Sequence, residues 1–456
     1  MSAFALPEKA NLARHDRKNN KKTIWAWCMF DWANQSYNMV ITSTIFPAYY
    51  VAVTANKATG DTVSFFGHRY VNTVLSNYIL GLSYLIVVVL LPILTSIADY
   101  KGNKRLYLQF FTWLGALACA GLFFFKPDSG LELPMICFGL ACIGYCGGFV
   151  FYNSYLPQIA TVDQQDSVSA KGFIYGYVGS LIMQVLCFVV VLSPKTFGIT
   201  SDDLPARISF LMVFVWWLGF SIIPFRLLPK GEPNPGSHKY NVLTGGFKEL
   251  ARVFKKVRTM PLLKRFLSSF FFYSVGVQTI MLVAANFAAK ELLMSEEMLI
   301  TIILIVQVVG VIGAWLTSIL STKYGNVKTL VGLVALWTLL CLSLYFIASV
   351  PQFIVAAVIV GAGMGGVQSI SRSTYSKYLP PNITDTASFF SFYDVTEKSS
   401  IVVGLFCFGF VEALTHEMRD SALALDAFFL IGLILMISLM FAEKKMKNLP
   451  TAPIAE

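Results

Sequence analysis

Long apolar stretches separated by short polar connections dominate this chain of 456 residues. Each stretch is close to the roughly 20 residues that an α-helix needs to cross the hydrocarbon core of a bilayer. A longer polar segment near the middle divides the stretches into two sets of six. The pattern therefore predicts an all-α polytopic membrane protein with twelve transmembrane helices, near residues 25–53, 71–98, 106–125, 134–156, 172–192, 208–228, 263–289, 298–320, 327–350, 353–371, 387–414 and 423–442.

The domain organisation follows from these spans. We expect an N-terminal tail over 1–24, a six-helix bundle over 25–228, a linker over 229–262, a second bundle over 263–442 and a C-terminal tail over 443–456. The linker joins the bundles, and a specific binding role is the alternative. Apolar residues of the linker recur at helical spacing, and basic residues recur on the opposite face. The apolar set is Leu243, Phe247, Leu250, Phe254 and Val257, and the basic set is Lys248, Arg252, Lys255, Lys256 and Arg258. This pattern predicts an amphipathic helix that lies on the inner membrane surface.

Composition excludes several classes of protein. Only 13% of residues are charged and 56% are hydrophobic, which excludes an ordinary soluble enzyme and a disordered chain. The net charge of +10 does not indicate nucleic-acid binding, because the basic residues lie between apolar stretches. Twelve spans would place both tails and every second connection on one side of the membrane, and these segments hold 27 of the 35 Lys and Arg residues. The positive-inside rule then predicts two cytoplasmic termini, and the compact loops indicate a plasma membrane of the bacterial inner type.

The residues give no sign of a metal site, a cofactor or a catalytic centre. All eight cysteines lie inside apolar stretches, where packing explains them, and the four histidines are scattered. No nucleophile, base and orienting group recur at an identifiable spacing, so enzyme activity is not expected. The polar, basic start of the chain does not resemble a cleavable signal peptide.

Two short motifs recur at one spacing. Asp99-Tyr-Lys-Gly102 follows the second span, and Thr322-Lys-Tyr-Gly325 follows the eighth. Tyr155-Leu-Pro157 and Tyr378-Leu-Pro380, which close the fourth and tenth spans, are separated by the same interval along the chain. Equal offsets at corresponding places predict a duplicated six-helix unit. Parallel repeats of this kind resemble the halves of major facilitator transporters, which work by alternating access around a site near the midplane.

The loop after the second span is similar to the signature of that superfamily between spans two and three. Asp99, Gly102, Lys104 and Arg105 match the signature, whereas Thr95 stands where its leading glycine belongs. We expect Asp99 to cap or pair at cytoplasmic helix ends and to stabilise one closed state. The second copy has lost the acid, so this lock is expected to be one-sided.

Polar side chains inside the first span form the first candidate site. A charged group at the bilayer centre costs on the order of 3 kcal/mol, so each one needs a reason. Asp31, Asn34, Gln35, Asn38 and Thr42 fall on one helical face. That stripe either lines a cavity, with a substrate or proton role for Asp31, or pairs with a neighbouring helix.

Spans ten and eleven form the second candidate site. Gln368 and Arg372 share a helix face in span ten, and Asp394, Glu397 and Lys398 follow in span eleven. Two acids and two bases can form a neutral structural network, or a carboxylate can exchange a proton during transport. Single amides elsewhere in the spans are weaker candidates; they are Asn153, Gln184, Gln278, Asn286 and Gln307. We rank Gln278 and Asn286 above the rest, because they lie in span seven, the repeat partner of span one.

Glycines in the spans have a simpler interpretation. The run Gly361 to Gly366 lies in an apolar span with no preceding strand, so close helix packing explains it better than a phosphate-binding loop. Gly172, Gly176 and Gly179 likewise predict a packing or hinge face of span five.

These residues resemble a known family. Phe30-Asp-Trp-Ala-Asn-Gln-Ser-Tyr37 is similar to the Tyr-Asp-Trp-Ala-Asn-Ser-Ala-Tyr signature of the vacuolar effluxer-like branch of the major facilitator superfamily. The run from Gly365 to Ser373, the motif Phe390-Ser-Phe-Tyr-Asp394 and the span-five glycines resemble further motifs of that family. The resemblance implies a polytopic transporter, and its eukaryotic members are associated with efflux of amino acids from the vacuole. Gln35, Ser36 and the charged stretch from Asp394 to Lys398 depart from the family pattern.

The combined expectation is a major facilitator fold that carries a small polar solute by secondary active transport. An amino acid or related zwitterion is favoured, with Asp31 as proton site or ammonium partner and Arg372 as carboxylate partner. The alternatives are a cation-coupled sugar symporter, using Trp32, Asn34 and Asn153, and a lysolipid flippase with an apolar cavity open sideways to the bilayer. A third alternative, a membrane scaffold that transports nothing, is not favoured, because such a protein has little use for costly charged residues within its spans. Expected partners are the solute, protons or sodium and the lipid bilayer; no nucleic acid is expected, and the protein is expected to be a monomer.

Overall fold

The computed structural model describes residues 18–54, 61–127, 129–231, 242–294, 296–380, 383, 385–415 and 417–447. The predictions made for the remaining parts of both tails and for residues 232–241 of the linker lie outside these described residues. The same holds for the side chains of Leu243 and Phe247 in the predicted amphipathic helix and for that of Asn286.

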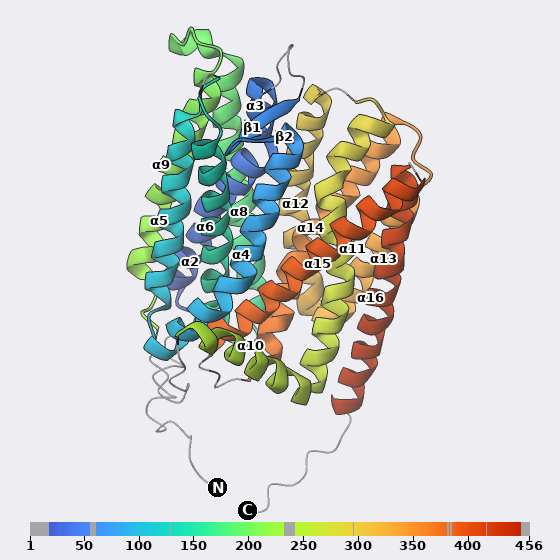
Figure 1. Ribbon diagram of the computed structural model, residues 1–456. Coiled ribbons are helices and arrows are strands. Elements are labelled where there is room, and N and C mark those ends of the chain that lie inside the picture. The colour runs from blue at the N-terminus through green and yellow to red at the C-terminus, as the bar shows by residue number, and fades with distance from the viewer. Residues whose placement is uncertain are drawn as a thin grey trace, which may run out of the picture. The chain divides into compact units, whose positions relative to one another are not determined.

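Membrane-length helices make up most of the described chain (Figure 1). Ten of them are long and apolar enough to cross a bilayer. They are α4 (Asn72–Lys101), α5 (Lys104–Gly121) with η2 (Leu122–Phe124), α6 (Glu132–Asn153) with α7 (Leu156–Ile159), α8 (Gln165–Leu192), α9 (Leu204–Leu227), α11 (Pro261–Glu291), α12 (Glu296–Tyr324), α13 (Asn326–Leu344), α14 (Val350–Tyr378) and α16 (Met418–Lys447).

The other two predicted spans are helical as well. The first is a continuous helical run made of α2 (Lys21–Tyr37), η1 (Asn38–Thr44) and α3 (Ile45–Thr54), and the eleventh is α15 (Thr386–Thr415). All twelve predicted spans thus coincide with helices. Agreement is close because a backbone in hydrocarbon must satisfy its hydrogen bonds within the segment, so each long apolar run forms a helix.

The first span contains a segment that the sequence analysis missed. Residues Asn38 to Thr44 form a π-helix, which takes up an extra residue per turn. Ser43 Oγ and Thr44 Oγ1 donate to the carbonyls of Asn38 and Met39, five residues back. Such segments often mark functional positions in helices. No periodicity of apolar residues announces one.

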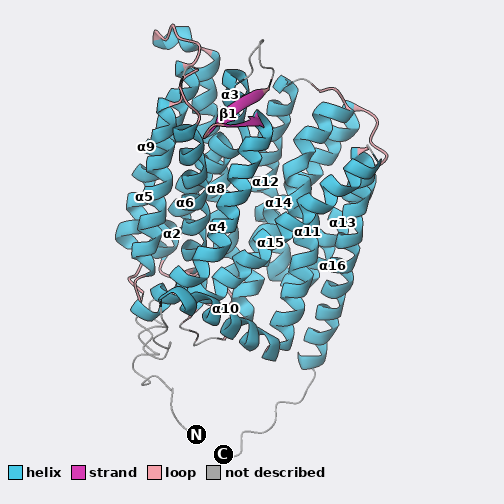
Figure 2. Cartoon of the chain, in the orientation of Figure 1, coloured by secondary structure: helices cyan, strands magenta, loops and turns pink. Residues whose placement is uncertain are grey.

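A small β-hairpin corrects the purely helical expectation (Figure 2). Strand β1 (Thr62–Phe65) pairs antiparallel with β2 (His68–Val71), and Thr62 lies opposite Val71. The turn residues Phe66 and Gly67 both have positive φ, at 47° and 79°, as a two-residue hairpin turn of right-handed twist requires. Each strand of the hairpin is far shorter than a membrane span, so a search for apolar segments of span length does not detect it.

Packing divides the chain into two units, which are described separately. The first comprises Met1–Glu249 and Thr384–Ser391, and the second comprises Leu250–Ile383 and Phe392–Glu456. In the first unit α5 packs on α6, and α2 packs on α8 and α9. In the second unit α12 packs on α14, and α16 packs on α11 and α13. The first turns of α15 thus belong to the first unit, although they follow the second unit's helices in sequence.

Glycines set the closest helix contacts in both units. A Cβ on Gly144 of α6 would lie 2.4 Å from the backbone nitrogen of Gly115 in α5. In the second unit a Cβ on Gly361 would lie 2.7 Å from the carbonyl oxygen of Val306. Gly176 and Gly179 of α8 meet α2 in the same way, at Gln35 and at Trp32. The packing role predicted for Gly361, Gly176 and Gly179 is confirmed, because only a residue without a side chain permits such approach.

The repeat is visible in the loops after α4 and α12. Gly102 and Gly325, which occupy equivalent positions in the two copies of the motif, have φ of 65° and 89°. Both positions therefore require the left-handed region that glycine enters without strain. Gly102 ends α4, and Gly325 stands just before α13.

The linker contains a helix, as predicted. Helix α10 (Val242–Thr259) forms where it is expected, but its buried residues in the described part are Val253 and Val257. Phe254, which was assigned to the apolar stripe, is 49% exposed and has the guanidinium of Arg258 over its ring. Val253 lies beside the predicted stripe. A stripe on a membrane surface would face lipid, so the exposed Phe254 is compatible with that prediction, which stays a prediction.

Candidate functional site

Asp31 lies at the centre of the candidate site in the first unit. Its side chain is fully buried in α2, and Tyr152 Oη of α6 donates a hydrogen bond of 2.7 Å to its Oδ2. The ring of Tyr152 stacks on those of Trp27 and Phe30, with centroid distances of 4.3 and 4.9 Å. Trp27 Nε1 also donates to the Tyr152 carbonyl at 2.9 Å. Aromatic packing therefore fixes the donor that faces the buried carboxylate.

The other amides of the predicted stripe have different environments. Gln35 is half-buried and accepts a hydrogen bond of 3.1 Å from Tyr145 Oη, and Asn38 is half-buried at the start of the π-helix. Asn34 is fully buried, and neither polar atom of its side chain has a hydrogen-bond partner in the described part of the chain. The stripe is therefore not one uniform lining: Gln35 and Asn38 are partly accessible, whereas Asn34 is not.

The remaining amides of the first unit are buried between helices. Asn153 ends α6, one residue after Tyr152, and Gln184 of α8 exchanges hydrogen bonds of 3.0 to 3.1 Å with Thr44 in the π-helix. Gly176 brings α8 so close to α2 that a Cβ there would lie 2.8 Å from Gln35 Cγ and 3.5 Å from Asp31 Cβ. Polar and small residues of α8 thus support the α2 stripe.

A second polar cluster forms in the second unit between α11 and α15. Gln278 Nε2 donates to Glu397 Oε1 at 2.9 Å. Lys398 Nζ lies 3.5 Å from Glu397 Oε2 and 3.9 Å from Asp394 Oδ1. Asp394 Oδ2 is buried and has no hydrogen-bond partner among the described residues. Three of the residues predicted to form a charge network are therefore in contact, together with Gln278.

Arg372, the fourth charged residue of that prediction, lies on α14. It is almost completely buried, and its neighbour Ser371 shares a hydrogen bond of 2.7 Å with Tyr273 Oη of α11. Gln368, one turn away, places its Nε2 at 3.8 Å from Met281 Sδ of α11. Helix α11 thus contacts polar residues of both α14 and α15. Asn286 lies further along α11, and its side chain is outside the described part.

The loop after α4 holds a third group of polar contacts. Asp99 is buried and accepts hydrogen bonds from the backbone and hydroxyl of Ser388, both at 2.8 Å, and from the backbone of Ala387 at 3.3 Å. Its Oδ1 lies 3.0 Å from Lys104 Nζ, and Lys104 in turn donates to Thr386 Oγ1. Asp99 therefore caps the start of α15, where unpaired amides and the helix dipole favour an anion.

The neighbours of Asp99 complete this arrangement. Arg105 Nη1 donates to the Leu228 carbonyl at 3.1 Å, where α9 ends, and Gln158 Nε2 of α7 donates to Thr386 Oγ1 at 3.1 Å. In the second unit the equivalent loop lacks the acid: Thr322 Oγ1 donates only within its own helix in the contacts of the described chain, to Ser318 O.

Sequence reasoning missed the residues that organise these clusters. Tyr145, Tyr152 and Tyr273 supply hydroxyls to them, but an aromatic residue in an apolar span cannot be distinguished from core by sequence. Asp426 was also missed, although an acid within span twelve is a visible signal. It is buried on α16, beside Cys341 of α13. In the described part of the chain no three His, Cys, Asp or Glu side chains gather as metal ligands.

Comparisons with known proteins agree with this architecture. The family model of the vacuole effluxer Atg22-like proteins matches residues 19–449. The MFS-type transporter YxiO of Bacillus subtilis is 28% identical over 419 residues, which cover 90% of this chain and 93% of that protein. Autophagy-related protein 22 of Yarrowia lipolytica is 30% identical over 333 residues, 66% of this chain and 55% of that one.

Solved structures show the same fold at low identity. The structure of FucP, a major facilitator superfamily transporter in an outward conformation, matches with a TM-score of 0.68 and 14% identity, over 91% of this chain and 98% of that chain. The proton:xylose symporter XylE matches with a TM-score of 0.66 and 12% identity, over 91% of this chain and 95% of that chain. Because the family model spans nearly the whole chain, this integral membrane protein belongs to the vacuole effluxer Atg22-like family of major facilitator superfamily transporters, and it is not an enzyme.

Proposed function

We propose that the chain moves an amino acid or a related zwitterion across the membrane by proton-coupled alternating access. The observation that carries this proposal is the pair of buried acidic clusters inside membrane-spanning helices, one at Asp31 with Tyr152 and one at Glu397 with Gln278 and Lys398. Buried ionisable groups in a span are costly, and substrate and proton pathways are their usual reason. The vacuolar effluxer description of the family supports an exported solute.

Each cluster has a role in this proposal. Asp31 takes up a proton or pairs with the solute's ammonium group, and the half-buried Gln35 and Asn38 supply hydrogen bonds to it. Arg372 pairs with the solute's carboxylate, because a guanidinium recognises that group with two parallel hydrogen bonds. Asp394 or Glu397 exchanges the coupling proton beside Lys398. Gln368, Asn153 and Asn286 are further candidates for contact with the solute.

The Asp99 network is proposed to stabilise one state of the transport cycle. Asp99 and Lys104 hold the first turns of α15 through the hydrogen bonds described above, while Gly102 ends α4 and Arg105 bonds the Leu228 carbonyl. A transporter that alternates between two states must break such contacts in each cycle, so their strength sets the balance between the states. The loss of the acid in the second copy leaves this lock one-sided.

The setting of the transporter is also proposed. The excess of Lys and Arg in alternate connections supports two cytoplasmic termini. The bacterial relative, which aligns over most of its length, supports a plasma membrane of the inner-membrane type. We propose a monomer that couples movement of the solute to protons or sodium.

Uptake into proteoliposomes tests the proposal. The purified protein is reconstituted and supplied with a labelled amino-acid mixture, with and without an imposed pH gradient, and compared with Asp31→Asn and Asp426→Asn. Gradient-driven accumulation that is lost in Asp31→Asn and kept in Asp426→Asn is the expected result. Asp426 is the matched control, because it is also a buried acid in a span but lies outside both clusters.

Other outcomes would redirect the assignment. No accumulation of any amino acid by the native protein would remove the amino-acid proposal, and labelled sugars and lysolipids would be supplied next. Accumulation that does not respond to the pH gradient would keep the solute and remove proton coupling. A lysolipid is the second candidate, because an apolar groove between α8 and α9 opens to one side of the first unit.

A further inference from the structure

Three aromatic residues of α6 form one stripe beside the buried acid of α2. Tyr145, Phe149 and Tyr152 fall at positions i, i+4 and i+7, which share a helix face. The ring centroids of Tyr145 and Phe149 are 6.1 Å apart and the two rings are stacked, and the centroids of Phe149 and Tyr152 are 5.6 Å apart. The stripe is therefore a continuous row of rings.

This row of rings lies along the polar face of α2. Tyr152 Oη donates to Asp31 Oδ2 at 2.7 Å, and Tyr145 Oη donates to Gln35 Oε1 at 3.1 Å. Asp31 and Gln35 are one turn apart on α2, so the two hydrogen bonds mark two levels of the same surface. Phe149 stands between the two tyrosines on α6, and its ring occupies the interval between the bonded pairs.

Part of this surface is accessible. Gln35, Tyr145 and Phe149 are half-buried, so the row of rings is not sealed inside the unit. Helix α8 contributes another aromatic side chain, because the half-buried Tyr177 lies close enough to Asp31 to interact with its charge. A solute that approaches Asp31 therefore meets aromatic side chains from two helices.

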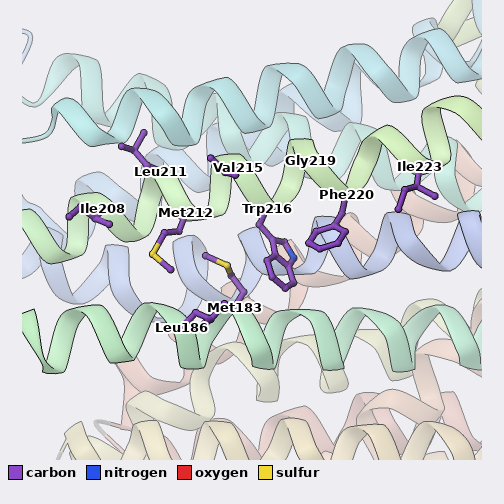
Figure 3. A pocket seen from close by; sticks show the side chains of 10 residues that line it. All are labelled: Met183, Leu186, Ile208, Leu211, Met212, Val215, Trp216, Gly219, Phe220 and Ile223. Carbon is purple, nitrogen blue, oxygen red and sulfur yellow. The ribbon is translucent and has the colours of Figure 1, made fainter. Parts of the chain in front are cut away.

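This surface differs from the apolar groove between α8 and α9. Figure 3 shows that groove, which is lined by ten residues, eight of them from α9 and none with an ionisable side chain. The row of rings on α6 instead faces the carboxylate of Asp31. The carboxylate attracts a cation by its charge, and the negative faces of aromatic rings attract it through their quadrupole. The surface therefore suits a positively charged group.

The chemistry of the surface also selects the kind of cation. A primary ammonium carries three N–H donors, and each needs an acceptor once water is removed. Asp31 Oδ2 and Gln35 Oε1 already accept a hydrogen from a tyrosine, and the phenyl ring of Phe149 between them offers no acceptor. The methyl groups of a methylated ammonium need no acceptor, and aromatic rings stabilise its charge.

We propose that this surface binds the methylated ammonium group of the solute, so that the carried zwitterion is an N-methylated amino acid of the betaine class. The inference rests on the proposed function, because it assigns the ammonium end of the zwitterion named there. Asp31 supplies the negative charge, and the rings of Tyr145, Phe149 and Tyr152 contact the methyl groups. Partial burial strengthens these contacts, since the attraction between a cation and a ring is larger where water is excluded.

Binding of the N-methyl series of glycine to the full chain tests this assignment. Glycine, N-methylglycine, N,N-dimethylglycine and N,N,N-trimethylglycine share one carboxylate and one positive charge, and they differ only in their methyl groups. Each is titrated into the purified protein in detergent at neutral pH and followed by isothermal titration calorimetry. We expect the affinity to rise along the series, with trimethylglycine bound about tenfold or more tightly than glycine, the effect of one desolvated contact between a cation and a ring.

Substitutions at Phe149 separate the ring from its apolar volume. Phe149→Leu should lower the affinity for trimethylglycine by about tenfold and leave that for glycine unchanged, whereas Phe149→Tyr keeps a ring and should retain both. Phe151→Leu is the matched control on the same helix, because the ring of Phe151 stacks on Tyr107 of α5 at 5.3 Å and lies outside the stripe. It should bind the series as the native protein does. Size-exclusion chromatography checks that each variant is folded.

The outcomes separate this inference from the proposed function. Glycine bound as tightly as trimethylglycine would overturn the methylated-ammonium site and leave transport of a zwitterion standing. Equal losses in Phe149→Leu and Phe151→Leu, or no binding of any member of the series, would also overturn it. Trimethylglycine that binds through Phe149 but is not accumulated in proteoliposomes under a pH gradient would support the site and contradict proton-coupled transport.

Discussion

At the scale of single residues, buried charge and its hydrogen bonds decide which side chains matter. Asp31 has a tyrosine hydroxyl at 2.7 Å, and Glu397 has an amide donor at 2.9 Å. Each donor comes from another helix, so the helix packing positions it. Hydrogen bonds to charged groups contribute about 1.5 to 3 kcal/mol, compared with about 1 kcal/mol for neutral pairs.

Two tyrosines of α6 allow this difference to be measured. Tyr152→Phe removes the donor to buried Asp31, whereas Tyr145→Phe removes a donor to the neutral amide of Gln35. We expect Tyr152→Phe to lower the free energy of unfolding by about 1.5 to 3 kcal/mol, and Tyr145→Phe by about 1 kcal/mol or less. Unfolding in detergent, followed by circular dichroism, gives both values. Equal losses would mean that the hydrogen bond to Asp31 is no stronger than the one to the neutral amide of Gln35.

A pH-dependent contribution is expected just before α9. Asp203 accepts a hydrogen bond from Ser201 Oγ and pairs with Arg207 at 2.7 Å, and together these interactions lower the pKa of Asp203 below its ordinary value. The ionised form therefore stabilises the folded state at pH values above about 3.9, the ordinary pKa, and this contribution is lost as the pH falls through the lower folded-state pKa.

Melting temperatures at about pH 7 and at about pH 3 test this sign. The native protein should lose more stability on acidification than Asp203→Asn does. Asp202→Asn changes the exposed neighbouring acid and should behave like the native protein. If Asp203→Asn lost as much as the native protein, the pairing of Asp203 would contribute nothing to the acid response.

At the scale of elements, glycine contacts determine how closely the helices approach. Gly144 and Gly115 bring α5 and α6 together, and Gly176 and Gly179 bring α8 onto α2 beside Asp31. The π-helix in the first span adds an irregular segment directly after the polar stripe, and Gln184 of α8 contacts it through Thr44. Close packing and irregular backbone thus both occur beside Asp31, although close glycine contacts also occur elsewhere along the spans.

The Gly144 contact predicts a steric effect. A Cβ at Gly144 would lie 2.4 Å from a backbone nitrogen, which cannot move without shifting α5, so Gly144→Ala should cost about 1 to 3 kcal/mol or more. Gly81→Ala adds the same methyl group at an open position and should be neutral or slightly stabilising. Thermal unfolding of the two purified variants measures the difference. A neutral Gly144→Ala would show that α5 and α6 separate easily.

At the scale of the whole molecule, the duplication and the loop after α4 organise the transporter. The two copies share a glycine of positive φ at equivalent positions, but only the first carries an acid. Asp99 holds residues Ala387 and Ser388, which lie far later in the chain. The contact therefore fixes the part of α15 that belongs to the first unit.

Hydrogen exchange at the start of α15 tests the lock. Asp99→Asn keeps an acceptor oxygen but loses the charge, so the amides of Ala387 and Ser388 should exchange at least about tenfold faster, since about 1.4 kcal/mol corresponds to a factor of ten. Thr322→Ala changes the corresponding position of the second copy, which bonds only within α12 in the described contacts, and should leave exchange unchanged. Unaltered exchange in Asp99→Asn would exclude the proposed lock.

The sequence alone determined the membrane-spanning class, the positions of the spans, the duplication and the family. These features are local or periodic: hydrocarbon forces each long apolar run into a helix, and motifs repeated at a constant interval need no structure to be seen. The candidate residues Asp31, Asp394 and Glu397 also followed from sequence, because an acid within a span is conspicuous.

Only the tertiary structure decided which side chains meet. It separated Asn34, which is fully buried, from Gln35, which is partly accessible, and it brought Gln278 to Glu397 and Ser388 to Asp99. It also showed the groove along α9, whose residues cannot be distinguished from those of any other apolar span in the sequence. The physical reason is that hydropathy specifies that a helix crosses the membrane, whereas its rotation and neighbours depend on side-chain packing between segments far apart in the chain.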